Sequence, residues 1–150
     1  LVDKQHDPIY ISIAEKVQAL IDKWRQKNKD YELIFKEGVG IVEGIDKLKQ
    51  RQKELAFSDL EYSILLVMER ELGTKKELVE DVRQIAKAIE KEMFKGWVLH
   101  PTARRNIEKE LRVFLRKIKV KYEIPYEKLD AMFSVLKESI AEYGKNDKDS

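Results

Sequence analysis

The chain has 150 residues, enough for one domain with a sizeable core, and its 43% hydrophobic and 39% charged residues are typical of a folded helical protein rather than a disordered one. It contains no cysteine, which excludes disulfides and cysteine-based zinc sites and agrees with a reducing, cytoplasmic setting. No apolar run approaches the roughly 20 residues that a membrane-spanning helix needs, and we expect the chain, which begins with leucine, to be a piece of a longer protein.

The spacing of apolar residues predicts an all-α protein of five or six helices. The first helix covers about 11–27, and Ser12 with Glu15 gives it a capping-box pattern. Asp30 is expected to cap a second, long helix. Three glycines lie inside this second helix: Gly38, Gly40 and Gly44. Each costs about 1 kcal/mol relative to alanine, so either another helix packs closely there or the helix is broken. We favour close packing.

The third helix is predicted to begin at the capping box of Ser58 and Glu61 and to end at Gly73. The fourth follows at once. Thr74 with the glutamate three residues later is a second capping box, and the apolar pattern continues to Gly96.

The fifth helix is predicted over about 102–122, and the sixth runs from Pro125, which breaks the chain, to Gly144. The remaining residues, 145–150, read as a loose polar tail. Connections of a few residues favour antiparallel neighbours. With no internal linker, we expect 1–144 to form a single bundle of mostly antiparallel helices.

The fifth helix carries a row of positive charge opposite an apolar row. The basic row has steps of four, three, four and three residues: Arg105, Lys109, Arg112, Arg116 and Lys119. The apolar row repeats this spacing two residues further along: Ile107, Leu111, Phe114 and Ile118. Two residues of α-helix turn the chain by about 200°. The apolar row can therefore face a core while the basic row faces solvent.

Positive charge is concentrated in this region. Residues 95–121 hold nine Lys and Arg against two Glu, a net of +7, so the rest of the chain carries −5 within a total of +2. Such a concentration favours an anionic partner, and a solvated helix face is the alternative. The predicted nucleic-acid-binding residues are Arg104, Arg105, Lys109, Arg112, Arg116, Lys117, Lys119 and Lys121.

The compensating negative charge lies earlier in the chain, between residues 54 and 82. Its acidic residues are Glu54, Asp59, Glu61, Glu69, Glu71, Glu77, Glu80 and Asp81. An acidic side and a basic side on one bundle favour oriented docking onto a partner.

The chain lacks the patterns that catalysis needs. It has no phosphate-binding glycine loop of the G-x-x-x-x-G-K-[ST] type, and its two histidines, His6 and His100, lie far apart with no metal-ligand spacing. Glu77 and Asp81 could form a paired carboxylate site, but nothing in the pattern indicates that they are desolvated. We therefore expect no catalysis by this chain alone. Trp24 and Trp97 are expected to anchor the packing rather than to stack on a ligand.

Several landmarks follow one another in a recognisable order. They are the segments 57–62 (FSDLEY), 82–89, Gly96-Trp97, 105–117 (RNIEKELRVFLRK) and 122–125 (YEIP). In this order they resemble the helical C-terminal domain of the motor subunit, or R subunit, of type I restriction–modification enzymes. The resemblance extends over roughly residues 10–143.

The resemblance implies a bacterial or archaeal DNA translocase and endonuclease whose nuclease and ATP-driven motor domains lie upstream, together with the ATP and magnesium they use. This domain would hold no cofactor. It would join the motor subunit to the methyltransferase and specificity subunits and contact double-stranded DNA. The alternative is a pure protein–protein docking module whose basic face meets an acidic subunit. We expect the isolated domain to be monomeric.

Overall fold

The computed structural model describes residues 8–148 and consists of α-helices, with one short 3₁₀ turn and no strand in that range. The all-α prediction is confirmed, with six α-helices over these residues. Contacts between the helices divide the chain into two compact units, Leu1–Ser58 and Asp59–Ser150. The single domain expected over 1–144 stays a prediction.

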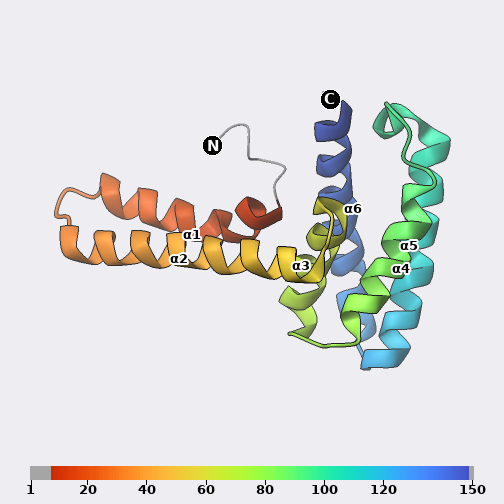
Figure 1. The fold of residues 1–150 in the computed structure, drawn as a ribbon, viewed down its shortest axis with the longest axis horizontal. Helices are drawn as coiled ribbons and strands as arrows, with labels where there is room; N and C mark the ends of the chain where they lie inside the picture. The colour runs from red at the N-terminus through yellow and green to blue at the C-terminus, as the bar shows by residue number, and fades with distance from the viewer. Residues whose placement is uncertain (1–7, 149–150) are drawn as a thin grey trace. The chain divides into compact units, whose positions relative to one another are not determined.

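The first unit is a helical hairpin. Helix α1 (Pro8–Arg25) packs against α2 (Tyr31–Leu55), and Figure 1 shows the two lying side by side. Asp30 caps α2 as predicted, because its carboxylate accepts a hydrogen bond of 3.1 Å from the backbone N–H of Leu33. An ion pair between Lys23 and Glu37 joins the two helices near the connection.

Helix α2 also carries an apolar row on its solvent side. Its members are spaced four, four and three residues apart, so they share one side of the helix, and all four are exposed: Tyr31, Phe35, Val39 and Val42. No residue of α2 is buried. The hairpin therefore leaves large apolar side chains in solvent.

The glycines of α2 neither break the helix nor mark a tight crossing. A Cβ placed on Gly38 would lie 3.7 Å from a methyl carbon of Leu20, an ordinary contact. Apart from the local helix backbone, no described atom lies within 4 Å of that position at Gly40 or Gly44. The expectation of unusually close packing is therefore wrong. The hairpin leaves a groove of about 280 Å³ beside Gly40 and Gly44.

The second unit is a closed arrangement of four helices: α3 (Asp59–Leu72), α4 (Leu78–Glu90), α5 (Pro101–Tyr122) and α6 (Tyr126–Lys148). Each helix packs against the next one along the chain, and α6 packs against α3 to close the ring (Figure 1). The short helix η2 (Trp97–Leu99) contacts α5 and α6. In this ring α5 packs between α4 and α6, so α3 lies diagonally across from it.

Two predicted helix starts are wrong. Helix α1 begins at Pro8, whose fixed φ suits the first turn of a helix, so Ser12 lies inside the helix instead of capping it. Helix α4 begins at Leu78 rather than after Thr74, because Gly73 adopts a left-handed φ of 77° and Lys75 then accepts a backbone hydrogen bond from Leu78. By contrast, α3 begins and ends where Ser58 and Gly73 predict.

Two predicted helix ends are also wrong. Helix α4 ends at Glu90, where backbone hydrogen bonds of the tighter i to i−3 type replace the α-helical ones, and Gly96 instead starts η2 with a φ of 83°. Helix α6 continues through Gly144 to Lys148, so 145–148 are helical rather than a loose tail, and 149–150 lie outside the described residues. Gly144 is required for packing: a Cβ there would overlap the side chains of Trp97 and Val98.

Candidate nucleic-acid interface

Helix α5 has well-defined ends that fix the direction of its side chains. Pro101 occupies its first turn, and the ring Nδ1 of His100 accepts a 3.3 Å hydrogen bond from the backbone N–H of Ala103. The helix ends at Tyr122, and the C-cap residue Glu123 adopts a left-handed φ of 53° and donates its backbone N–H to the carbonyl of Lys119. His100 is thus the N-cap of the basic helix.

The apolar row of α5 faces the core, as predicted. All of its four members are buried: Ile107, Leu111, Phe114 and Ile118. Ala103 and Leu115 widen the buried side. This packing holds the opposite side of the helix toward solvent.

The basic row therefore lies on the solvent side of α5 and is called here the basic stripe: Arg105, Lys109, Arg112, Arg116 and Lys119. Four of these side chains are exposed and Lys119 is half-buried. Within the described part of the chain, none of the five forms an ion pair with a carboxylate. Among the residues that the structure describes, their positive charge has no counter-charge in direct contact.

The other three predicted contact residues lie away from the stripe. Arg104 and Lys117 are each one residue from a member of the stripe, a rotation of about 100°, and Lys121 is two residues from Lys119, about 200°. Arg104 lines a small cavity of about 50 Å³ beside Trp97, and Lys117 and Lys121 line a cavity of about 120 Å³ between α4 and α5. The structure thus brings five of the eight together.

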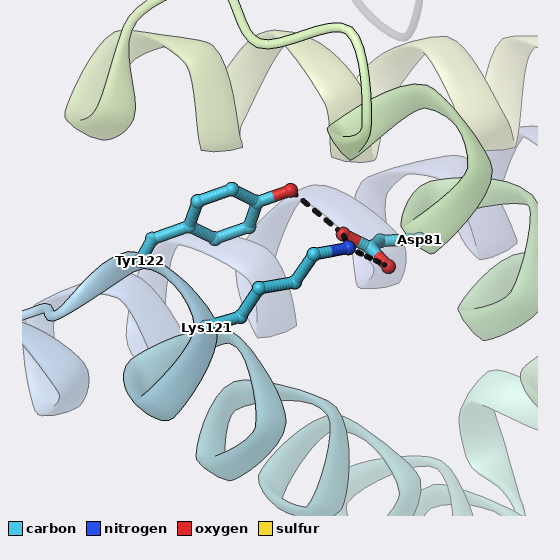
Figure 2. Close-up of polar contacts among 3 residues, drawn as sticks. All are labelled: Asp81, Lys121 and Tyr122. Carbon is cyan, nitrogen blue, oxygen red and sulfur yellow. Dashed lines mark hydrogen bonds and ion pairs between the residues drawn. The ribbon is translucent and has the colours of Figure 1, made fainter.

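Lys121 points toward α4 and is already paired. Figure 2 shows the carboxylate of Asp81 between Lys121 and Tyr122. The Lys121 ammonium donates to both carboxylate oxygens, at 2.9 and 3.1 Å, and the Tyr122 hydroxyl donates at 2.9 Å. The hydrogen bond with Asp81 raises the pKa of Lys121. Burial, followed by the hydrogen bond to Asp81, raises the pKa of Tyr122.

The carboxylates do not form the pair that the sequence left open. Asp81 contacts the two side chains from the end of α5, while Glu77 is exposed at the start of α4. Glu108 of α5 forms an ion pair of 3.3 Å with Lys137 of α6. Within residues 8–148, no three His, Asp or Glu side chains gather where they could hold a metal ion. His6 lies outside the described residues.

The two tryptophans differ. Trp97 is only 3% exposed and anchors the packing as predicted, although its ring nitrogen has no hydrogen-bond partner among the described residues. Trp24 is 53% exposed, so the prediction of an anchor is wrong for it. Its ring meets Tyr31 edge-on at 5.9 Å, and the ammonium of Lys29 lies 4.7 Å from the ring centre.

Sequence reasoning missed a set of residues beside the stripe, on α6. Tyr126, Asp130 and Phe133 are spaced four and three residues apart and line a groove of about 270 Å³ together with Arg112 and Arg116. The guanidinium of Arg112 lies 4.9 Å from the centre of the Phe133 ring. The spacing was visible in the sequence, but the pairing of α6 with this side of α5 was not.

No helix within the described residues combines the length and apolar character that crossing a membrane requires. In comparisons with protein-family models, with curated proteins and with solved structures, none matched this chain.

Proposed function

We propose that the basic stripe of α5 binds the phosphate backbone of duplex DNA without reading its sequence, and that the chain is a non-catalytic assembly domain. The proposal of DNA binding rests on the stripe itself, which consists of five neighbouring cations without a carboxylate partner in the described residues. Contacts from Lys and Arg to phosphate position a protein on DNA but carry no base information.

The diagonal placement of charge supports oriented docking. Most of the acidic residues of 54–82 belong to α3 and α4, and α3 lies across the four-helix unit from α5. Asp81 is held by Lys121 and Tyr122, which keeps its charge from the stripe side. An anionic duplex approaching the stripe would therefore meet cations first.

The proposal that the chain is an assembly domain rests on its resemblance to type I restriction motor subunits and on the exposed apolar row of the hairpin. The apolar row on α2 leaves contiguous large side chains in solvent, and such patches are typical of protein–protein contact sites. In this proposal the row contacts the methyltransferase core, while α5 holds the DNA nearby. The ATP-driven and nuclease steps belong to upstream domains.

A pure protein-docking module, whose stripe meets an acidic subunit, is the second candidate, and the exposed row on α2 favours it equally. A mobility-shift assay with this chain and plain duplex DNA separates the two. A shift that weakens as salt increases supports DNA binding, whereas no shift at low salt contradicts it and leaves the docking module.

A further inference from the structure

The groove between α5 and α6 has a composition that phosphate binding alone does not need. Two arginines of the basic stripe, Arg112 and Arg116, form one wall, and Tyr126, Asp130 and Phe133 come from α6. Its volume of about 270 Å³ lies just below the range of about 300–1,000 Å³ typical of pockets for whole small ligands. The groove can therefore take one small group rather than a large molecule.

Tyr126 is the exposed member of this groove. Its side chain is 71% exposed, and it makes no ring contact or hydrogen bond with any other described residue. Phe133, in contrast, is half-buried and lies beneath the guanidinium of Arg112. One aromatic ring thus positions an arginine, and the other presents a free face next to it.

The charges restrict what can occupy the groove. The two guanidinium groups require an anion, the Tyr126 face favours a flat aromatic group, and the Asp130 carboxylate, which has no ion-pair partner in the described part of the chain, favours a hydrogen-bond donor. A nucleotide supplies all three, as phosphate, base face and base N–H groups. An acidic peptide would satisfy the arginines but would offer Tyr126 no flat aromatic face.

A duplex cannot use the groove in the same way, because its base faces are stacked on one another. Single-stranded nucleic acid exposes these faces, and proteins bind it by combining a basic surface with aromatic rings. We propose that the groove between α5 and α6 binds an unstacked nucleotide of single-stranded nucleic acid, with Arg112 and Arg116 on its phosphate and Tyr126 against its base. This inference rests on the proposed function, since the same stripe supplies the phosphate contacts.

The test compares a short fluorescent oligodeoxythymidylate with a duplex of equal length, by fluorescence anisotropy, using the whole chain. Tyr126→Ala should weaken single-strand binding by roughly 5- to 10-fold, the low end of the loss on removing a stacking ring. It should leave duplex binding unchanged, and Tyr126→Phe should retain both. Leu99→Ala is the control, since Leu99 is also largely exposed, at 68%, but lies on η2 and does not line the groove; it should change neither affinity.

The outcomes separate this inference from the proposed function. Suppose that the chain binds duplex in a salt-sensitive manner but Tyr126→Ala alters neither affinity, or lowers both equally. The proposed nucleotide site is then wrong, while duplex binding by the stripe still stands. If the chain binds neither nucleic acid, both proposals fail. If a polyglutamate peptide displaces the oligonucleotide and its own binding depends on Tyr126, the groove takes acidic protein segments and the inference is overturned.

Discussion

The ammonium of Lys121 lies 2.9 Å from a carboxylate oxygen of Asp81, forty positions earlier in the chain, and joins the end of α5 to α4. Lys121 belongs to the same basic helix as Arg116, yet its ammonium is paired with a carboxylate of α4. The basic residues of α5 therefore fall into two groups with different roles, one structural and one available to a ligand.

This division predicts different effects for two changes that remove the same charge. Arg116→Gln should weaken DNA binding and make the slope of log K against log salt shallower by about 0.9, as expected for one lost phosphate contact. Lys121→Gln should leave that slope unchanged. Salt titrations of both variants by fluorescence anisotropy measure this, and equal slopes for the two variants would contradict the division.

The Asp81 cluster also predicts loss of stability at alkaline pH. The pKa values of Lys121 and Tyr122 are both raised in the folded protein, so folding favours their protonated forms. This contribution is fully present below their ordinary values of about 10.4 and 10 and is lost as pH rises through the raised folded values. Urea unfolding between neutral pH and pH of about 11 should therefore show a decline that Asp81→Asn reduces. If the free energy of unfolding of Asp81→Asn declined equally, the Asp81 cluster would not be the cause of the decline.

Leu111 tests the buried side of α5. It is fully buried, so Leu111→Ala should lower the free energy of unfolding by about 2–5 kcal/mol while leaving every charge in place. Val120 on the same helix is 79% exposed, and Val120→Ala should change stability by no more than about 0.5 kcal/mol. Chemical denaturation followed by circular dichroism compares them. A small effect of Leu111→Ala would mean that α5 does not pack as described.

Replacing two helical glycines by alanine should change the stability of the protein in opposite directions. Gly144→Ala should destabilise the protein by about 1–3 kcal/mol, because its Cβ would overlap Trp97 and Val98. Gly40→Ala has free space and should stabilise α2 by about 0.5–1 kcal/mol through helix propensity. Thermal unfolding of both variants measures the difference. Equal shifts of the same sign would contradict the packing of η2 on α6.

Helix types could be predicted because apolar spacing is a strong signal, and the buried row of α5 is its clearest case. Some boundaries could not, because a glycine can either end a helix or allow close packing. Gly73 ends α3, whereas Gly144 lies within α6 and allows Trp97 to approach. The capping pattern at Thr74 was likewise misleading, because a backbone turn closes at Lys75 before the helix begins.

The candidate site was predictable only where it lies on one helix. The stripe follows from the spacing of its residues along α5, so sequence alone locates it. The pairing of Lys121 with Asp81, and the groove that joins Arg112 to Tyr126, depend on which helices become neighbours. Such contacts between residues far apart in sequence carry no local signal.

The docking proposal has its own test on α2. If this chain belongs to a motor subunit as proposed, replacing Phe35 and Val39 with serine in that subunit should reduce its association with the proposed methyltransferase partner, because both side chains are exposed members of the apolar row. Val120→Ser, an exposed apolar change on α5, is the control. Analytical ultracentrifugation showing an undiminished complex with the double variant would exclude the α2 row as the contact.

A salt titration of duplex binding tests whether the basic stripe holds DNA phosphate. Arg105 to Lys119 span about 21 Å of helix, and with phosphates spaced about 3.4 Å along one strand a straight helix can reach only some of them. We expect three to five contacts, a slope of roughly −3 to −4.5 and micromolar or weaker affinity near physiological salt.

The decisive variant replaces four members of the stripe by glutamate: Arg105, Lys109, Arg112 and Arg116. Because these residues lie opposite the buried row, the variant should keep the circular dichroism spectrum of the wild type and lose duplex binding at every salt concentration. A variant that keeps its spectrum and still binds duplex DNA like the wild type would show that the stripe is only a solvated helix face.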